Sequence, residues 1–410
     1  MKVLMLTPYV TINSKKEFSR NKTGFGYMVY DIAKGVANKS HVEVLASYTR
    51  GAEFKMDNVL FLKRSFGLFL LNIHHVISFI LVFRLWKKYH MQFPTLIRLL
   101  YSWFISGYYY GVIANRKFDV VHIHGCSFET ELWMHVCKKA NQKFLVTLHG
   151  LDSFSDSINL ERAGKEYERD FLKRVVSGEI IITVISTGIK KTIEETYQKY
   201  DCSNIKVVCN SFSELPQTKR INVRVKYSIP EKAKVVLYVG NISKNKNQVQ
   251  MIEAFDLLPE KSRQEIYVLF CGNKPESQDS FNQDLEKSNY AEHLIVCGSI
   301  DKEDMPNYYR AADGVVLLSI REGFGLSLIE GLHYGKPCMM FSDMDAFSDI
   351  YDDNAVIAIP NRQNETVANC LLQLLSKKWD QEAIAKLSQR FTVNSMANNY
   401  IGVYQTILNG

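Results

Sequence analysis

Residues 321–331 read Arg321-Glu322-Gly323-Phe324-Gly325-Leu326-Ser327-Leu328-Ile329-Glu330-Gly331 and closely follow the apolar run 314–319. This order predicts a buried parallel strand at 315–318, a tight loop at 322–325 and a helix at 326–334, which Gly335 and Pro337 close. The loop is therefore predicted at the carboxyl end of a strand. Ligands bind at that edge of open α/β sheets, and the free amides at a helix start suit a phosphate.

Two carboxylates flank the glycine turn. Glu322 is predicted in the loop, and Glu330 about five residues into the helix, which at ~1.5 Å per residue is on the order of 7–8 Å along its axis. One carboxylate can thus meet a sugar and the other a ribose. The alternative is that both are solvated charges, which is the commonest fate of a glutamate. The glycines on both sides of Phe324, and the helical face that Glu330 shares with Leu326, favour a site.

Length and charge limit the class of protein. A chain of 410 residues predicts two domains, and 46% apolar with 23% charged residues is typical of a globular protein. Residues 1–150 carry 20 Lys and Arg against 8 Asp and Glu, whereas residues 251–410 carry 13 against 23. A basic half fits nucleic acid, an anionic membrane, a phosphorylated substrate or simple solubility. Its aromatic residues form apolar runs rather than a dispersed stacking platform, which argues against nucleic acid.

The spacing of the cysteines and the sequence of residues 2–8 indicate the cellular compartment of the protein. The eight cysteines include no Cys-x-x-Cys pair, which argues against a disulfide framework and against a zinc site. We therefore expect reduced, mostly buried thiols in a cytoplasm. Residues 2–8 resemble a strand, and no secretory signal is visible.

Strand-like runs alternate with helical patterns, which predicts parallel sheets with crossover helices. The first series comprises residues 3–6, 42–46, 120–124, 144–148, 180–185 and 205–208. The second comprises residues 235–239, 266–271, 294–297, 315–318, 338–341 and 356–359. We predict an N-terminal domain at 1–212, a linker at 213–233, a second domain at 234–390 and a final helix within 391–410.

Residues 59–114 depart from this alternation and predict an apolar helical insert with basic clusters. The run 66–83 approaches the length of a membrane span, but polar residues interrupt it and it falls inside a domain. Apolar helices with basic flanks fit a surface that dips into anionic lipid headgroups. The alternatives are helices that cover the first domain, or a dimer interface.

Residues 319–335, with Pro337, resemble the donor-site signature of the family 4 retaining glycosyltransferases, S-x-x-E-G-F-G-x-x-x-x-E-x-x-x-x-G-x-P. The resemblance implies the α/β GT-B fold, in which two Rossmann-like domains with parallel sheets face a central cleft. The first domain takes the acceptor, the second takes a nucleotide-sugar donor, and the last helix crosses back to the first domain. It also implies that no metal or other cofactor is needed.

The resemblance extends to the phosphate-binding loop after strand 235–239. The family shows Gly-Arg there and a Lys five residues after the Arg; Gly240 and Lys246 match, but Asn241 replaces the Arg. Arg321 or Lys244 is a hypothetical source of the missing charge, and the alternative for Lys246 is a solvated surface lysine. The donor-binding residues implied in the second domain are Gly240, Asn241, Lys246, Arg321, Gly323, Phe324, Gly325, Leu326 and Glu330.

Two features of the first domain complete the implied site. Gly24 and Gly26, ahead of a helix predicted at 28–37, resemble the glycine loop that lets backbone approach the donor; the alternative is a simple turn. His149 ends the strand 144–148 and matches the family pattern T-x-H-G, in which the histidine faces the donor sugar; the alternative is a structural histidine. His122 and His124 suggest a metal only weakly, because no third ligand is evident.

The implied reaction moves a hexose or N-acetylhexosamine from a nucleotide-diphosphate sugar, UDP being favoured, to a lipid-linked, lipopolysaccharide or polysaccharide acceptor in bacterial cell-surface glycan synthesis. The anomeric configuration is retained by same-face substitution, with His149, Glu322 and Lys246 as catalytic residues. We expect a cytoplasmic protein, peripheral on the inner face of the membrane through 59–114. The alternatives are a non-catalytic subunit, favoured only by Asn241, and a sugar-nucleotide isomerase on the same fold.

Overall fold

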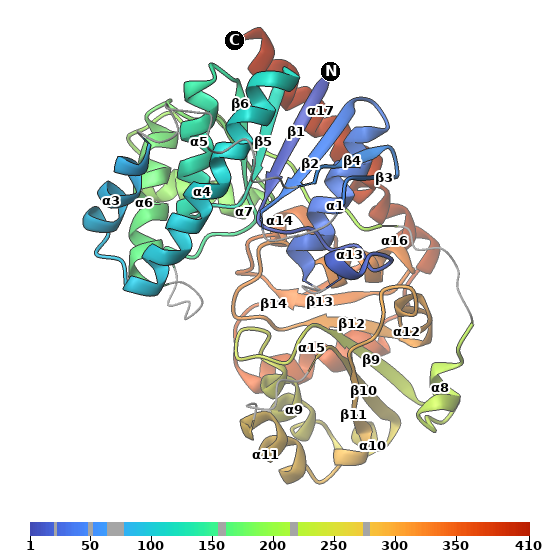
Figure 1. Ribbon diagram of the computed structural model, residues 1–410. Coiled ribbons are helices and arrows are strands. Elements are labelled where there is room, and N and C mark those ends of the chain that lie inside the picture. Colours follow the sequence, from blue (N-terminus) through green and yellow to red (C-terminus); the bar gives the residue numbers. More distant parts are fainter. Residues whose placement is uncertain (20–22, 48–51, 64–77, 155–160, 214–219, 274–278) are drawn as a thin grey trace. The chain divides into compact units, whose positions relative to one another are not determined.

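The computed structural model describes residues 1–19, 23–47, 52–63, 78–154, 161–213, 220–273 and 279–410. These form two compact units, each described by itself. Unit 1 comprises Met1–Asn210 with Val393–Gly410, and unit 2 comprises Ser211–Thr392. Each unit is built around a mainly parallel sheet with helices packed against it (Figure 1).

The sheet of unit 1 has eight strands in the order β3-β4-β2-β1-β5-β6-β7-β8, and every neighbouring pair is parallel except β3 with β4. Its central strands are buried along almost their whole length because helices cover both faces. The strands are β1 Lys2–Thr7, β2 His41–Ala46, β3 Phe54–Met56, β4 Val59–Phe61, β5 Val120–His124, β6 Phe144–Leu148, β7 Ile182–Val184 and β8 Ile205–Val207.

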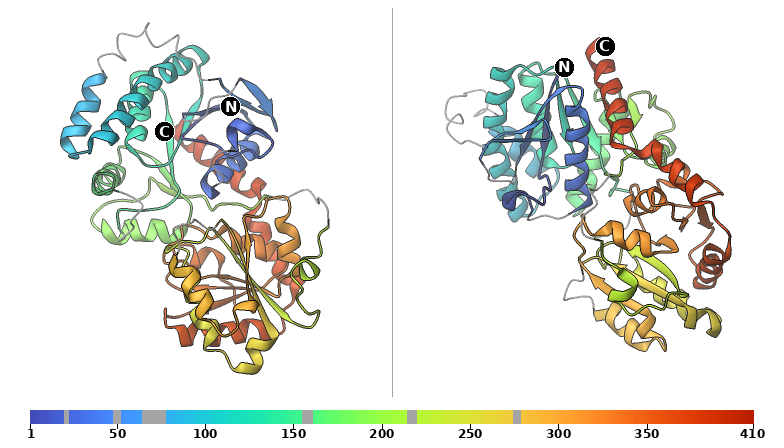
Figure 2. Two further views of the ribbon diagram at one scale, coloured as in Figure 1. Left: turned by 60° about the horizontal axis from the view of Figure 1, so that its bottom comes forward. Right: turned by 90° about the vertical axis from the view of Figure 1, so that its right-hand side faces the viewer.

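The helices of unit 1 include the end of the chain. They are α1 Gly24–Ala37, α3 Phe79–Lys88, α4 Phe93–Arg116, α5 Phe128–Lys139, α6 Arg162–Val176, α7 Thr187–Thr196 and α17 Val393–Asn409. Helices α1 and α17 lie side by side, as two views show (Figures 1 and 2). A side chain at Gly35 would meet Val393 Cγ1 at 2.8 Å, so a glycine is needed for this close approach.

Unit 2 contains a six-stranded, fully parallel sheet in the order β11-β10-β9-β12-β13-β14. Its strands are β9 Lys234–Val239, β10 Ile266–Cys271, β11 Leu294–Gly298, β12 Gly314–Leu317, β13 Cys338–Phe341 and β14 Val356–Ile359. Its helices are α8 Val223–Lys226, α9 Gln248–Asp256, α10 Glu260–Glu265, α11 Asp279–Lys287, α12 Met305–Ala311, α13 Leu326–His333, α14 Phe347–Ile350, α15 Asn364–Ser376 and α16 Gln381–Leu387.

The structure confirms every strand predicted from the sequence, with ends shifted by at most two residues. Two predictions need correction. The insert 59–114 is not helical throughout, because its first residues form β4, which pairs with β2. Helix α1 begins at Gly24 rather than at residue 28, because the Thr23 hydroxyl caps it by accepting a hydrogen bond from Gly26 N. Part of the run 66–83 and of the linker 213–233 lies outside the described residues.

The sheet order places one switch point in each unit, where strand order reverses and ligands bind beyond the carboxyl ends of the strands. In unit 1 it lies at β1, between β2 and β5, and in unit 2 at β9, between β10 and β12. Of the helices in the described part of the chain, none is both long and apolar enough to cross a membrane.

Candidate active site

The loops that follow β9 and β12 meet at the switch point of unit 2. Residues 240–247 follow β9, residues 318–325 follow β12, and these two strands are direct neighbours in the sheet. The Lys246 ammonium forms an ion pair with the Glu322 carboxylate, although 76 positions separate them. Ser319 Oγ also donates to Glu322, at 3.3 Å. The sheet therefore brings together the two unit 2 residues that the sequence marks as catalytic.

Gly240 makes room for the Lys246 side chain. Its φ of +152° is rare for other residues, and an added Cβ would meet the Cδ and Cε atoms of Lys246 at 3.3 Å. The aliphatic part of the Lys246 side chain thus packs on the backbone of Gly240. The backbone carbonyl of Lys246 accepts a hydrogen bond from the buried Tyr238 hydroxyl. Tyr238 in turn accepts from Leu318 N at 2.9 Å, which links the two loops below the ion pair.

Asn245 joins the same two loops, a role that sequence reasoning missed. Its backbone carbonyl accepts from Ile320 N at 2.7 Å. Its side-chain amide donates to Arg321 O at 2.9 Å and accepts from Arg321 N at 3.2 Å. An asparagine in a polar loop is too common to be singled out before the contact is seen.

The Asn241 side chain, at the position where the family pattern has arginine, has a structural contact of its own. Its Oδ1 accepts from Asn273 N at 3.0 Å, in the loop after β10. Arg321 was one hypothetical source of the charge that Asn241 lacks. Burial raises the pKa of Asp345, and the charge of Arg321 opposes that rise, so Arg321 acts on Asp345. Lys244, the other, is exposed.

The turn into α13 contains Gly323 and Gly325, and its geometry requires a glycine at position 325. Gly325 has φ +90°, a left-handed conformation that favours glycine, and an added Cβ would meet Leu317 Cδ2 at 3.2 Å. Phe324 is 2% exposed and contacts Phe391 edge-on. Its side chain therefore anchors the loop in the core, and only its backbone is available to a ligand. Gly323, in the loop, and Leu326, the first residue of α13, are half-buried.

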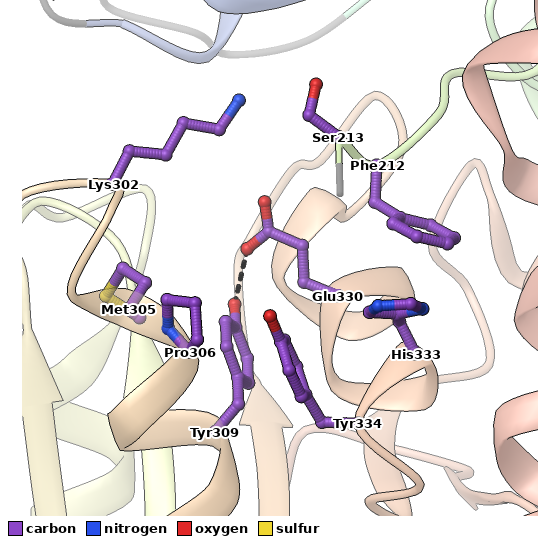
Figure 3. A pocket seen from close by; sticks show the side chains of 9 residues that line it. All are labelled: Phe212, Ser213, Lys302, Met305, Pro306, Tyr309, Glu330, His333 and Tyr334. Atoms are coloured by element: carbon purple, nitrogen blue, oxygen red, sulfur yellow. Dashed lines mark hydrogen bonds between the residues drawn. The ribbon is translucent and has the colours of Figure 1, made fainter. Parts of the chain in front are cut away.

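Glu330 lies in a separate pocket of unit 2, shown in Figure 3. Its carboxylate accepts a hydrogen bond from the Tyr309 hydroxyl at 2.6 Å and points toward the space between Lys302 and Ser213. The ring of Tyr309 stacks on Tyr334, with centroids 5.4 Å apart. The sequence placed Glu330 at the site but missed Tyr309, because nothing local connects α12 to α13. The pocket is lined by Phe212, Ser213, Lys302, Met305, Pro306, Tyr309, Glu330, His333 and Tyr334.

In unit 1 the glycine segment and His149 come together. The ring of Phe25, between the two glycines, lies edge-on to the His149 ring with centroids 4.8 Å apart. Gly24 is exposed, whereas Gly26 is buried, and a Cβ there would lie 2.1 Å from Thr11 Oγ1. Close packing of α1 against Thr11 thus requires a glycine at position 26.

His149 follows β6 and is half-buried. Its Nε2 lies 3.2 Å from Nδ1 of His124, which ends the neighbouring strand β5. Burial lowers the pKa of His149 to about 4, so the ring is neutral near pH 7. His149 belongs to unit 1, and Lys246, Glu322 and Glu330 belong to unit 2.

Comparisons with known proteins identify the family of this chain. A family model described as Glycosyltransferase Family 4 matches residues 23–213, and one described as Glycosyl transferases group 1 matches residues 219–394. The chain belongs to the family 4 glycosyltransferases.

Similar proteins include the O-antigen chain mannosyltransferase B of Escherichia coli, 26% identical over 174 residues, which are 42% of this chain and 45% of that protein. An uncharacterized glycosyltransferase of Methanocaldococcus jannaschii is 24% identical over 57% of this chain and 60% of its own length. The matched part thus spans less than two thirds of these relatives.

Solved structures of similar fold include WaaG, a glycosyltransferase involved in lipopolysaccharide biosynthesis, with a TM-score of 0.65 and 15% identity over 99% of this chain and 100% of that chain. HepE of Anabaena, in complex with UDP and glucose, has a TM-score of 0.67 and 15% identity over the same shares. At this identity the likeness concerns the fold. Two parallel-sheet α/β domains of this kind are the GT-B architecture.

Proposed function

We propose that this protein transfers a sugar from a nucleotide-diphosphate sugar to a glycan or lipid-linked acceptor in bacterial cell-surface glycan synthesis. The observation that carries the proposal is the Lys246–Glu322 pair at the switch point of unit 2, beside the amino terminus of α13. Breaking the bond between the anomeric carbon and the phosphate oxygen leaves negative charge on the diphosphate and positive charge on the sugar. A cation next to a carboxylate can stabilise both.

In the proposed reaction, Lys246 binds the departing diphosphate together with the free amides at the start of α13. Glu322 binds sugar hydroxyls and stabilises the positive charge at the anomeric carbon. The new bond joins the acceptor oxygen to that carbon on the face that the diphosphate leaves, so the configuration is retained. The acceptor proton passes to the leaving phosphate oxygen. Without donor, Glu322 neutralises Lys246, and the diphosphate displaces that ion pair.

Glu330 is proposed to bind the ribose of the donor. Its carboxylate accepts a hydrogen bond from Tyr309 and lines the pocket of Figure 3, and a carboxylate accepts hydrogen bonds from hydroxyl groups such as those of a ribose. The nucleotide is proposed to be UDP, in keeping with the UDP and glucose bound by the similarly folded HepE. The sugar is proposed to be a hexose or an N-acetylhexosamine. The reaction is proposed to need no metal or other cofactor.

The test of this function is a panel of UDP- and GDP-sugars scored for binding and for slow hydrolysis. We expect one donor to raise the unfolding temperature and to be hydrolysed slowly by the wild type, and Glu322→Gln to bind it without hydrolysis. Glu260→Gln, an exposed carboxylate of α10, is the matched control and should behave like the wild type. Binding without turnover by the wild type, even with glycan acceptors, would favour a non-catalytic subunit, the second candidate suggested by Asn241. Conversion of a donor into a different nucleotide sugar, without any acceptor, would favour an isomerase.

We further propose that unit 1 contacts an anionic membrane through α3 and the start of α4, which lie side by side (Figure 1). Among the large apolar side chains in the described residues that are exposed, half fall between residues 79 and 97. They are Phe79, Ile80, Phe83 and Trp86 on α3, and Phe93 and Ile97 on α4. The buried side of α3 carries Val82 and Leu85, so the outer apolar face is not needed for the core.

Charge complementarity supports a lipid surface as the occupant. Residues 58–118 contain no Asp or Glu, and their Lys and Arg residues are Lys63, Arg64, Arg84, Lys87, Lys88, Arg98, Arg116 and Lys117. Arg84 and Lys87 are exposed beside the apolar face of α3. Aromatic side chains flanked by cations insert at the headgroup level of anionic bilayers. Such a contact would place the protein next to a lipid-linked acceptor.

Vesicle sedimentation tests this contact. Arg84→Glu with Lys87→Glu removes two cations, each worth ~1 kcal/mol near an anionic surface. We expect binding to phosphatidylglycerol vesicles to weaken by at least about 30-fold. Lys190→Glu with Lys191→Glu, on α7 of the same unit, is the charge-matched control. If both double variants bind as the wild type does, or if the wild type ignores the vesicles, the contact is excluded.

A further inference from the structure

Three histidines lie close together in unit 1, beneath the carboxyl edge of its sheet. His122 and His124 belong to β5 and are fully buried, with ring centroids 4.0 Å apart. The inner one, His122, has both nitrogens occupied: Nδ1 lies 2.7 Å from the Tyr404 hydroxyl of α17, and Nε2 lies 2.6 Å from Thr147 Oγ1. The partners of His122 are therefore complete, and the ring is fixed between β6 and the last helix.

His124 is different, because only one of its nitrogens has a partner. Its Nδ1 lies 3.2 Å from Nε2 of His149. Its Nε2 is buried and has no hydrogen-bond partner among the described residues. The contact also occupies Nε2 of His149, so Nδ1 is the ring nitrogen that His149 has left for a substrate.

The positions of the protons follow from this asymmetry. Burial lowers the pKa of both rings, so each carries one proton near pH 7. If His149 donated through Nε2, the proton of His124 would have to sit on its own Nε2, where no acceptor is found. Orphaned buried N–H groups are rare in proteins. If instead His124 donates through Nδ1, only an unused lone pair remains at its Nε2.

We infer that His124 is a positioning residue that holds His149 in the tautomer protonated on Nδ1, so that His149 offers a ligand a hydrogen-bond donor and not a base. The tautomer itself depends only on the contacts within unit 1. The role toward the donor sugar rests on the proposed function: His149 would donate to an oxygen of the sugar or phosphate, and would not remove the proton of the acceptor. This leaves the leaving phosphate oxygen as the proton acceptor.

The tautomer can be measured without any substrate. We expect ¹⁵N-histidine spectra of the full chain at pH 7 to show one histidine signal pair, lost in His149→Phe, with the proton on Nδ1. His124→Leu, which keeps the volume but not the hydrogen bond, should release the ring into a mixture of both tautomers. A signal with the proton on Nε2 in the wild type, or an unchanged tautomer in His124→Leu, would overturn the inference.

Turnover separates positioning from folding. We expect His124→Leu to lower kcat about tenfold, the worth of one neutral hydrogen bond, with KM for the donor nearly unchanged. His124→Asn, whose amide can donate from the place of Nδ1, should restore most of kcat. Equal loss in both variants together with a lowered unfolding temperature would mean a purely structural role. If the spectra show the Nδ1 tautomer but no donor is ever turned over, the proposed function fails and the tautomer assignment stands.

Discussion

The switch-point edges of the two units share a sheet architecture but differ in chemistry. The edge of unit 2 carries a cation and a carboxylate in an ion pair, with Lys246 and Glu322 both half-buried. The edge of unit 1 carries His124 and His149, which are neutral and joined by a hydrogen bond. The edge of unit 2 therefore presents full charges, whereas the edge of unit 1 presents neutral hydrogen-bonding groups. Under the proposed function, unit 2 would stabilise the charge that develops in the reaction, and unit 1 would position the donor through neutral hydrogen bonds.

The largest effect should come from removing the cation of unit 2. Lys246→Ala leaves nothing at this position to bind the departing diphosphate, and we expect kcat/KM to fall by about 10²–10³. Lys261→Ala, an exposed lysine of α10, is the control and should have full activity. A Lys246→Ala enzyme with wild-type kinetics would show that the ion pair is structural and would remove the contrast between the two edges.

The pocket of Glu330 adds a second carboxylate to unit 2, and under the proposed function it binds the nucleotide. Glu330→Gln keeps the shape but loses the charged acceptor, and we expect UDP to bind about 10–100-fold more weakly. Titration calorimetry with UDP alone measures this without the sugar. Tyr309→Phe removes only the supporting hydroxyl and should cost less. UDP affinity that is unchanged in Glu330→Gln would place the nucleotide elsewhere.

Asn241 offers a way to sharpen the contrast by adding charge to unit 2. Asn241→Arg restores the family pattern, and we expect a gain of about fivefold in donor affinity, the worth of one added hydrogen bond to a charged phosphate after the bond to Asn273 N is lost. Asn241→Ala loses the same bond without gaining charge and serves as the control. Weaker donor binding in Asn241→Arg than in Asn241→Ala would show that an arginine at this position does not bind the donor phosphate in this chain.

The neutral edge of unit 1 should respond to acid. The folded pKa of His149 is lowered to about 4 from 6.5, so between these values the unfolded chain binds more protons than the native one. The contribution of His149 to stability is therefore complete above pH 6.5 and is lost as the pH falls toward 4. We expect the free energy of unfolding, measured in urea by fluorescence, to fall less between pH 7 and pH 5 in His149→Phe than in the wild type. Three of the four tryptophans, Trp86, Trp103 and Trp133, lie in unit 1 and report on it. An equal fall of the unfolding free energy in the two proteins would mean that folding does not lower the pKa of His149, and that its ring is charged at pH 5 in the folded state.

Local patterns were enough for the strands and for the turn into α13. A parallel strand covered on both faces is an apolar run of a few residues, and a helix end closed by Gly335 and Pro337 is readable within one segment. The prediction failed where local chemistry has two outcomes. The residues of the short strand β4 were predicted to begin a helical insert, because a run of three apolar residues fits both a strand and a helix. Helix α1 begins four residues earlier than predicted, because the Thr23 hydroxyl caps it.

The two α/β units, the glycine-loop motif at residues 319–335 and the candidates Lys246, Glu322, Glu330 and His149 can all be read from the sequence alone. Their partners become visible only in the folded chain: Asn245 joins the loops of unit 2, Tyr309 contacts Glu330, and His124 contacts His149. Periodicity and turn chemistry act within a few residues, so they can be read along the chain. Contacts between residues 21 to 76 positions apart depend on strand order and side-chain direction, which exist only once the sheets have formed.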